Sequence, residues 1–308
     1  MCGLFGMIDY KGVLNCWEKK RLIQTLANAS EIRGKDATGI AFLLREQIQI
    51  YKRALPAHKL HISLPLDVTM VMGHTRLATQ GAFLENQNNH PFYGRCNQEE
   101  FALAHNGILY NDRELRIREN LPATDIETDS YIAQLLEKEG AINTDTLAHM
   151  AEKVKGSFTF TIINRQGLFI IKGNSPFYLL HFKKGFYLYA STKEIMEYVL
   201  KKLKLKKWEY RQIPINSGEI VHLHRNGQIG LGKFVDTSSF DNWNWNPKKN
   251  YYLDYKGVLC KGKNNYGITQ EELEQFMFQY DLDENDIEEL FCDPKQVQEI
   301  IDELNLWR

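Results

Sequence analysis

A cysteine directly after the initiator methionine is the feature that most constrains this chain, which opens Met1-Cys2-Gly3-Leu4-Phe5-Gly6. Initiator methionine is removed when the second side chain is small, so we expect Cys2 to become the N-terminus. Cys2 would then carry a thiol, with a pKa of about 8.5 in free cysteine, and an α-amine that titrates near roughly 7.7–8.0. A nucleophile and its base would therefore share one residue, as in N-terminal-nucleophile variants of the catalytic triad. The apolar residues 4–8 predict a short buried strand behind this terminus.

The composition indicates an ordinary globular chain. Its 308 residues fit one large domain or two smaller ones, and 43% hydrophobic residues suffice for a sizeable core. The net charge of −1 provides no basic field for nucleic acid, so we expect no nucleic-acid partner. Five scattered cysteines without a Cys-x-x-Cys pair indicate a reducing compartment, which we take to be the cytoplasm. Neither a signal peptide nor an apolar run of about 18 residues occurs, so we predict no membrane segment.

Apolar periodicity predicts helices and strands that occur in groups. Helical spacing covers residues 17–30, 112–119, 128–138, 144–154 and 193–203. Strand-like runs cover residues 4–8, 40–44, 47–51, 68–72, 101–105, 158–163, 168–171, 177–181, 186–189 and 219–224. This grouping predicts an α+β fold with largely antiparallel sheets rather than a regular βαβ alternation.

Polar motifs stand at the ends of several predicted strands, where catalytic groups are commonly placed. Gly73-His74-Thr75-Arg76-Leu77-Ala78-Thr79-Gln80-Gly81 follows one strand, and Ala104-His105-Asn106-Gly107-Ile108 ends another. Asn106-Gly107 is expected to form a tight turn with unusual backbone angles. A third polar cluster is Glu127-Thr128-Asp129-Ser130.

Together with the first six residues and Arg33-Gly34, these motifs resemble the class II glutamine amidotransferases. That family forms the glutaminase half of glucosamine-6-phosphate synthase, amidophosphoribosyltransferase and asparagine synthetase. The resemblance is closest to the glucosamine-6-phosphate synthase type, through Arg33-Gly34-Lys35-Asp36 and the His-Thr-Arg run, and it covers about residues 2–230. It implies a four-layer αββα sandwich of the N-terminal-nucleophile hydrolase type.

The resemblance implies a catalytic set of Cys2, Asn106 and Gly107. The Cys2 thiolate would attack the side-chain amide of glutamine. The Cys2 α-amine, directly or through a water, would take the thiol proton and return it to the leaving ammonia. The Asn106 side-chain amide and the Gly107 backbone N–H would bind the oxyanion, where each donor is worth about 3–4 kcal/mol. Water would then hydrolyse the γ-glutamyl thioester to glutamate.

The implied substrate-binding set is Arg76, Thr79, Asp129, His74 and Arg33. Arg76 would hold the α-carboxylate of glutamine in a bidentate fork, which a lysine cannot reproduce. Asp129 would pair with the α-ammonium. Arg33 and His74 are expected to support the site rather than react.

Each residue taken alone has a simpler interpretation. Arg76 could belong to a surface ion pair, and Asp129 could cap a helix or interact with its dipole. Asn106-Gly107 could be an ordinary hairpin turn, and His105 could be a buried histidine with satisfied hydrogen bonds. It is the occurrence of all these motifs with Cys2, in this order, that favours the family.

Two positions depart from the family pattern. Leu77 stands where synthase members have a tryptophan associated with gating ammonia toward a synthase domain, and Gln80 stands where they often have histidine. Glutamine binding therefore remains expected, whereas channelling of ammonia is in doubt. The pairs His58-x-x-His61 and His222-x-His224 lack an evident third ligand, so we predict neither a metal nor another cofactor.

We predict a glutaminase domain at residues 2–235, and a linker with an acidic, mostly helical extension of unknown role at residues 236–308. Between residues 271 and 303, 13 Asp or Glu residues accompany one lysine. The extension is shorter than the synthase domains of the resembled enzymes. We therefore expect a stand-alone glutaminase that uses glutamine and passes ammonia to a separate synthase subunit.

Two other functions stay open from the sequence. The chain could be an N-terminal-nucleophile amidohydrolase that acts on another γ-glutamyl or amide substrate. It could also be a protein that keeps the fold and senses glutamine without turnover. The state of the N-terminus separates the last case, because a retained Met1 would turn the Cys2 amine into an amide that cannot act as a base. The sequence does not indicate an oligomeric state.

Overall fold

The computed structural model describes residues 2–79, 81–128, 131–235, 251–253 and 259–261. Its contacts divide the chain into a unit of residues Met1–Asn242 and a unit of residues Trp243–Arg308. In the second unit, the described residues form two antiparallel strands, β14 (Tyr251–Leu253) and β15 (Leu259–Lys261). The predicted acidic helices lie outside the described residues. The domain boundary at residue 235 and the role of the extension stay predictions.

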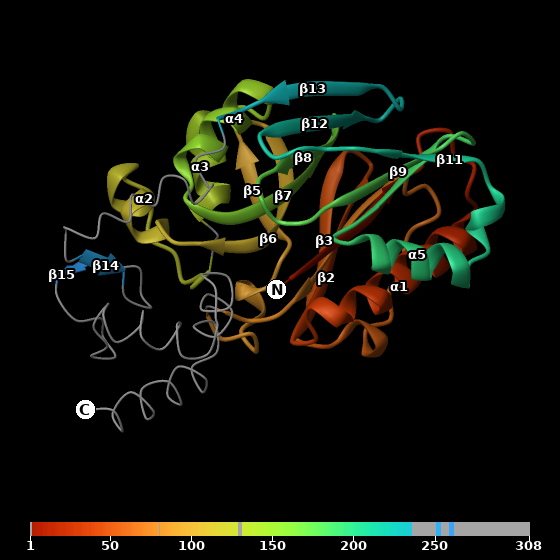
Figure 1. The fold of residues 1–308 in the computed structure, drawn as a ribbon, viewed down its shortest axis with the longest axis horizontal. Coiled ribbons are helices and arrows are strands. Elements are labelled where there is room, and N and C mark those ends of the chain that lie inside the picture. Colours follow the sequence, from red (N-terminus) through yellow and green to blue (C-terminus); the bar gives the residue numbers. More distant parts are fainter. Residues whose placement is uncertain (1, 80, 129–130, 236–250, 254–258, 262–308) are drawn as a thin grey trace, which may run out of the picture. The chain divides into compact units, whose positions relative to one another are not determined.

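Two antiparallel sheets form the centre of the first unit (Figure 1). The first sheet has the order β11-β9-β10-β1-β4-β2-β3, and the second has the order β13-β12-β8-β7-β6-β5. The strands of the first sheet are β1 (Gly3–Ile8), β2 (Ala37–Leu44), β3 (Gln47–Arg53), β4 (Met70–Arg76), β9 (Tyr178–Phe182), β10 (Phe186–Ala190) and β11 (Tyr210–Ile213). Those of the second sheet are β5 (Phe92–Cys96), β6 (Glu99–Leu109), β7 (Gly156–Asn164), β8 (Gly167–Lys172), β12 (Glu219–His224) and β13 (Ile229–Lys233).

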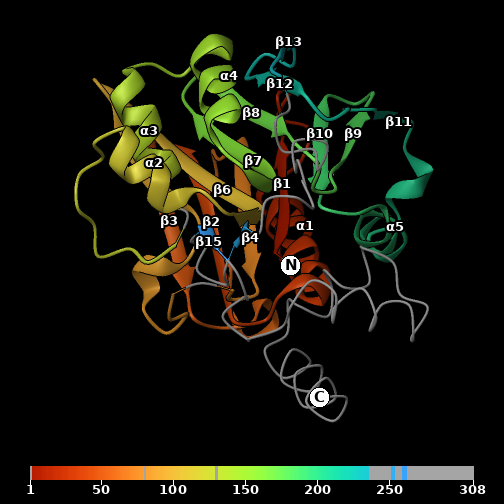
Figure 2. The same ribbon diagram turned by 60° about the vertical axis from the view of Figure 1, so that its left-hand side comes forward.

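Helices cover the outer face of each sheet (Figure 2). They are α1 (Cys16–Ser30), α2 (Asp112–Arg118), α3 (Tyr131–Glu139), α4 (Thr144–Lys153) and α5 (Lys193–Lys202). Helix α1 begins with a capping box, in which the Asn15 side chain accepts from the Glu18 N–H and the Glu18 carboxylate accepts from the Asn15 N–H. Helices α1 and α5 pack on the first sheet, and α3 and α4 pack on the second.

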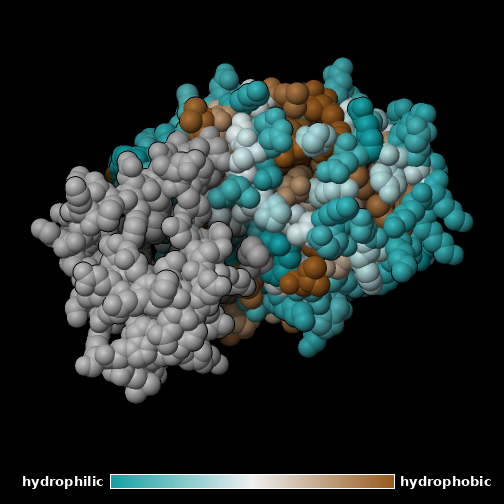
Figure 3. All heavy atoms as spheres, in the orientation of Figure 1, coloured by the Kyte–Doolittle hydropathy of each residue, from teal (hydrophilic) through white to brown (hydrophobic). Residues whose placement is uncertain are grey.

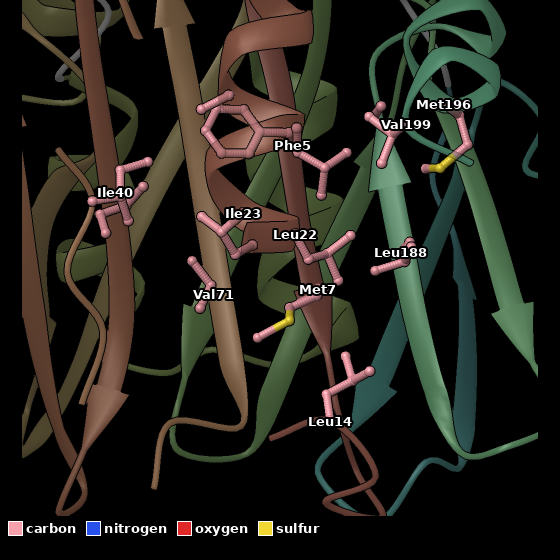
Figure 4. Close-up of a cluster of buried hydrophobic side chains, with 14 of the residues drawn as sticks. Phe5, Met7, Leu14, Leu22, Ile23, Ile40, Val71, Leu188, Met196 and Val199 are labelled. Carbon is pink, nitrogen blue, oxygen red and sulfur yellow. The ribbon is translucent and has the colours of Figure 1, made fainter. Parts of the chain in front are cut away.

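Side-chain alternation along the strands produces three separate cores, and these define the layers. On β1, Phe5 and Met7 point toward α1, where Figure 4 shows them beside Leu22. Leu4 and Ile8, which alternate with them, join the core between the two sheets. A third core lies between the second sheet and its helices. The layer order is therefore α-β-β-α, which confirms the predicted α+β sandwich. The burial of both strand faces also explains the continuous apolar run of β1.

The structure corrects the predicted ends of two strands. Strand β4 continues through His74, Thr75 and Arg76, because those residues pair with β1 on one side and β2 on the other. Strand β6 likewise continues through Asn106–Gly107, which pair with Thr159 and Phe158 of β7, so the predicted tight turn is wrong. A neighbouring strand supplies backbone partners that local turn propensity cannot anticipate. Strands β5, β11 and β13 were not predicted from apolar periodicity.

Candidate active site

Cys2 stands at one end of the space between the two sheets. It precedes β1, and the strand alternation puts it on the same side as Leu4, which faces the second sheet. The β1–β4 register pairs Gly3 with Thr75, so one further step places Cys2 opposite Arg76. The Cys2 thiol is half-buried and donates to the Leu77 carbonyl, with an Sγ–O distance of 3.6 Å. Two predicted site residues from different parts of the sequence are therefore neighbours across one strand pair.

Arg33 joins Cys2 to the second sheet. It ends the short 3₁₀ helix Glu31–Arg33 that follows α1. Its Nε donates to the Cys2 carbonyl at 2.7 Å, and its Nη2 donates to Asn106 Oδ1 at 3.4 Å. Burial lowers the pKa of Arg33 below its ordinary value, and the nearby Cys2 acts in the opposite direction. One guanidinium thus links the Cys2 backbone to the Asn106 side chain, and the supporting role predicted for Arg33 stays a prediction.

Asn106 presents a buried hydrogen-bond donor at this point. Its side chain is 1% exposed, and Oδ1 is oriented by Arg33. Among the residues that the structure describes, Asn106 Nδ2 has no hydrogen-bond partner. Buried amide donors are nearly always satisfied, and leaving one without a partner costs about 1–3 kcal/mol. A donor retained at that cost, on a side chain bonded to the same Arg33 that binds the Cys2 carbonyl, is suited to an oxygen that is present only when a ligand or an intermediate is bound.

Gly107 follows in a conformation that other residues rarely adopt. Its φ is +144°, and a Cβ at this position would lie 1.9 Å from the Ser157 carbonyl oxygen of β7. The strand can therefore pass so close to β7 only with glycine here. The oxyanion-binding role predicted for the Gly107 N–H stays a prediction.

Arg76 is the last residue of β4 and is almost completely buried, so it is not part of a surface ion pair. Its Nη1 donates to Asn89 Oδ1 at 2.6 Å, and its Nη2 donates to the Gly81 carbonyl at 3.1 Å. Its backbone carbonyl accepts from the Asp36 N–H at 3.0 Å, which connects it to the Arg33-Gly34-Lys35-Asp36 motif. The guanidinium is therefore held in a defined orientation close to Cys2.

The remaining predicted substrate-binding residues are less completely placed. Thr79 is exposed in the loop after β4, and its role stays a prediction. Asp129 lies outside the described residues. Its neighbours are described: the Glu127 N–H donates to Asn88 Oδ1 at 2.9 Å, and Thr128 Oγ1 donates to the Asn88 carbonyl at 3.3 Å. The third polar motif thus approaches the loop that also contacts Arg76.

Three buried histidines form the support beneath these residues. His74 Nε2 donates to the His105 carbonyl at 2.9 Å and joins β4 to β6. The His74 ring lies 4.5 Å from the ring of His90, which packs 4.2 Å from Phe92. Burial lowers the pKa of His74 to about 3 and holds the pKa of His90 well below its ordinary value. Both rings are therefore neutral at physiological pH. The substrate-binding role predicted for His74 stays a prediction.

Sequence reasoning missed the segment that holds Arg76. Asn88, Asn89 and His90 are buried, and Lys52 of β3 donates to the Asn89 carbonyl at 2.5 Å and to the Pro91 carbonyl at 3.1 Å. Burial, and then the charge of Arg76, lowers the pKa of Lys52 to about 8. Residues 86–91 have the composition of a polar loop, and the sequence pattern does not show that the Asn88 and Asn89 side chains are buried. The one feature that could have drawn attention to the segment is the density of Asn and His beside Pro91.

A cavity of about 320 Å³ opens beside Arg33 and Leu77, two residues that form hydrogen bonds with Cys2. The residues 31–36 and Leu77 line it, and Ile32 is 71% exposed.

In the described part of the chain, no three His, Cys, Asp or Glu side chains come together as a metal site. His222 and His224 stack on each other, with ring centroids 3.7 Å apart, and the former also stacks on Phe169.

Comparison with known sequences shows what the chain is similar to. Residues 74–197 match the family described as a glutamine amidotransferase domain. The chain is therefore similar to glutamine amidotransferase domains. It is 28% identical over 239 residues to glutamine–fructose-6-phosphate aminotransferase (isomerizing) of Oceanobacillus iheyensis, a match that covers 72% of this chain and 38% of that protein. The enzyme of the same name from Helicobacter pylori strain J99 is 27% identical over 293 residues, with 89% of this chain and 43% of that protein covered. The chain thus spans less than half the length of these curated relatives.

Solved structures show the same fold for the amidotransferase domain. Glutamine phosphoribosylpyrophosphate amidotransferase from Bacillus subtilis, in complex with ADP and GMP, superposes with a TM-score of 0.61 at 20% identity. The match covers 76% of this chain and 49% of that chain. A structure described as the allosteric regulatory enzyme of purine biosynthesis gives the same TM-score at 18% identity, over 77% of this chain and half of the other. In the described residues, no helix is both long enough and apolar enough to span a membrane.

Proposed function

We propose that the amidotransferase domain hydrolyses the side-chain amide of glutamine through a thioester on Cys2, releasing ammonia and glutamate. The observation that carries the proposal is the buried Asn106 Nδ2. It is a donor without a partner among the described residues, and it is oriented by the same Arg33 that binds the Cys2 carbonyl. This arrangement supports an oxyanion site, because such donors act where negative charge develops in the transition state.

The reaction begins after removal of Met1. The Cys2 α-amine accepts the thiol proton, and the thiolate attacks the δ-carbon of the glutamine amide. The carbonyl oxygen becomes an oxyanion bound by Asn106 Nδ2 and the Gly107 N–H. When the C–N bond breaks, the α-ammonium returns its proton to the leaving nitrogen and ammonia departs. Water, deprotonated by the same amine, then attacks the thioester, and the Cys2 sulfur leaves as the thiol.

The amino-acid end of glutamine is assigned to Arg76 and Asp129. Arg76 lies one strand from Cys2, buried and fixed by two acceptors, which supports a bidentate contact with the α-carboxylate. Asp129 is assigned to the α-ammonium, and Thr79 to the edge of the same site. His74 contributes by holding β4 to β6.

Glutaminase assays on the processed protein test this proposal. We expect release of glutamate and ammonia from glutamine, and modification of Cys2 by a glutamine-like diazo-ketone, seen as a mass shift on the N-terminal peptide. Cys2→Ala should lose both properties. Cys16→Ala, at another half-buried cysteine, should retain both. A processed wild-type protein that neither turns over glutamine nor reacts at Cys2 would refute the mechanism. Binding without turnover would indicate a glutamine sensor, and turnover of other amides only would indicate a different amidohydrolase.

We also propose that the ammonia is passed to a synthase that binds the nitrogen acceptor. The names of the curated relatives describe transfer from glutamine to fructose 6-phosphate, and the chain matches less than half of each relative. Figure 3 shows apolar patches separated by hydrophilic side chains on one face of the described residues. Size-exclusion chromatography with a candidate synthase subunit, with and without residues 240–308, tests this step. Separate elution of the two proteins at every concentration would contradict it.

A further inference from the structure

Two adjacent asparagines, Asn88 and Asn89, are fully buried beside Arg76. Asparagine is mostly exposed in folded proteins, and a buried amide must have its hydrogen bonds satisfied. Both side chains meet this requirement with several partners each, so the pair is a built polar network. They precede β5, on a segment that neither the catalytic nor the substrate-binding assignments include.

Asn89 contacts Arg76 directly. Its Oδ1 accepts from Arg76 Nη1 at 2.6 Å, and its Nδ2 donates to the Phe83 carbonyl at 2.8 Å. These two bonds fix the amide orientation, because a flipped amide would place an N–H against the guanidinium and an oxygen against a carbonyl. Asn89 therefore presents its amide oxygen, an acceptor, to Arg76 and directs its amide nitrogen toward the Phe83 carbonyl.

Asn88 acts on the second acceptor of Arg76, the Gly81 carbonyl. Asn88 Nδ2 donates to the Ala82 carbonyl at 3.1 Å and to Glu127 Oε2 at 3.1 Å. With the Asn89 bond to Phe83, the pair thus binds two successive carbonyls of the loop that contains Gly81. Gly81 has a φ of +69°, and a Cβ there would lie 2.9 Å from Glu127 Cβ, so the loop packs closely against Glu127 at this glycine.

The segment that contains Asn88 and Asn89 is attached to strands β2 and β3 of the first sheet. Lys52 of β3 donates to the Asn89 and Pro91 carbonyls, and its own carbonyl accepts from Asn86 Nδ2 at 2.8 Å. On β2, a Cβ at Gly39 would lie 2.2 Å from the His90 carbonyl oxygen, so the segment packs directly on the strand. The segment that contains the asparagine pair is therefore hydrogen-bonded to β3 and packed closely against β2.

We propose that Asn88 and Asn89 are positioning residues that orient the Arg76 guanidinium and so set the specificity of the site for an α-carboxylate. The inference rests on the proposed role of Arg76 in binding glutamine. A guanidinium fixed at both terminal nitrogens meets an incoming carboxylate without reorienting, which lowers the entropic cost of binding. Without Asn89, Arg76 would sample several orientations, and substrates with and without a carboxylate would be bound more similarly.

The test compares glutamine with 4-aminobutanamide, which lacks only the α-carboxylate. In Asn89→Ala, we expect KM for glutamine to rise roughly 10- to 100-fold, the usual range for a lost hydrogen bond to a charged group, with kcat nearly unchanged. Turnover of 4-aminobutanamide should hardly change, so discrimination between the two amides falls. Asn88→Ala should shift KM in the same direction by a smaller factor, because it acts through the Gly81 loop.

A matched control and a double-mutant cycle separate positioning from general destabilisation. Asn111 is also buried and also holds a loop, through the Lys153 carbonyl and the Lys155 N–H, and these side-chain hydrogen bonds involve none of the described site residues. Asn111→Ala should leave KM for both amides unchanged. In an Arg76→Ala background, Asn89→Ala should add little, because the residue it orients is gone. A wild-type protein without glutaminase activity would remove the proposed function. Active protein in which Asn89→Ala leaves KM unchanged, or changes both amides equally, would overturn the positioning role alone.

Discussion

The two ends of the candidate site differ in how completely their hydrogen bonds are satisfied. At the reacting end, Asn106 is buried with one donor that has no partner among the described residues. At the head-group end, Arg76 and Asn89 are buried with their side chains bonded to defined partners. Both ends lie on the facing sides of the two sheets, so burial alone does not explain the difference.

The difference indicates which step each end serves. A donor left without a partner is stabilised only when an oxyanion forms, so it favours the transition state over the bound substrate. A guanidinium held rigidly by neutral acceptors meets the same carboxylate before and during reaction, so it contributes equally to both states. Substitutions at the reacting end should therefore change kcat, and those at the head-group end should change KM.

The largest expected effect is at Asn106. Asn106→Ala should lower kcat by roughly 10²- to 10³-fold, because a donor to the oxyanion is lost, with little change in KM. The same change removes the donor without a partner but also the Oδ1 acceptor of Arg33, so the two effects on stability oppose each other and the net change should be about 1 kcal/mol or less. Steady-state kinetics and denaturant unfolding on the same preparations check both outcomes. A comparable rise in KM would contradict the assignment of kcat effects to the reacting end and KM effects to the head-group end.

At the head-group end, Arg76→Lys should raise KM for glutamine by roughly 10- to 100-fold and leave kcat within a small factor. Lysine keeps the charge but loses the planar fork and the contacts to Asn89 and Gly81. Initial-rate measurements over a wide glutamine range would separate the two constants. A large fall in kcat with an unchanged KM would mean that Arg76 acts on the reacting amide rather than on the head group.

How far the sequence predicts this site depends on the kind of contact involved. Cys2, Arg33 and Asn106 were predicted as neighbours because each belongs to a motif in a known order. The structure brings them together through Arg33. The α+β layers followed from grouped apolar runs. In both cases the signal is local in the sequence.

Contacts between polar side chains of different segments carried no such signal. Asn88 and Asn89 read as loop residues, since nothing in the sequence reveals that Lys52 and the Gly81 loop enclose them. Asn106-Gly107 read as a turn, because its pairing with β7 depends on residues about 50 positions away. The sequence motifs indicate candidate reactive and binding residues such as Cys2 and Arg76. Which buried side-chain amides form hydrogen bonds around Arg76 depends on the tertiary fold.

A third prediction concerns the scaffold that joins the two ends. His74 precedes Arg76 by two residues, and its bond to the His105 carbonyl reaches the residue before Asn106. His74 has a folded pKa of about 3 and an ordinary pKa of 6.5, and the pKa of buried His90 is shifted in the same direction. As pH falls below 6.5, the unfolded chain takes up protons that the folded chain does not, so stability decreases.

Each of the two histidines should lower the free energy of unfolding by about 1.4 kcal/mol per pH unit between pH 6.5 and the folded pKa. Urea unfolding at pH 7, 6 and 5 measures this slope, which should be smaller in His90→Phe. His149→Gln, at an exposed position on α4, serves as the control and should leave the slope unchanged. An unaltered slope in His90→Phe would show that His90 does not contribute to the acid sensitivity.

The smallest expected effect is at Leu77, where the resembled synthases have tryptophan. Its carbonyl accepts from the Cys2 thiol, but its side chain is 44% exposed on the rim of the cavity. Leu77→Trp should therefore change stability by no more than about 0.5 kcal/mol and leave KM for glutamine nearly unchanged. The larger ring should cover the approach to Cys2, so modification by a bulky thiol reagent should slow, whereas Leu66→Trp at another exposed leucine should not slow it. A marked rise in KM instead would mean that the cavity belongs to the head-group end, and the two ends would then not be separable by side-chain substitution.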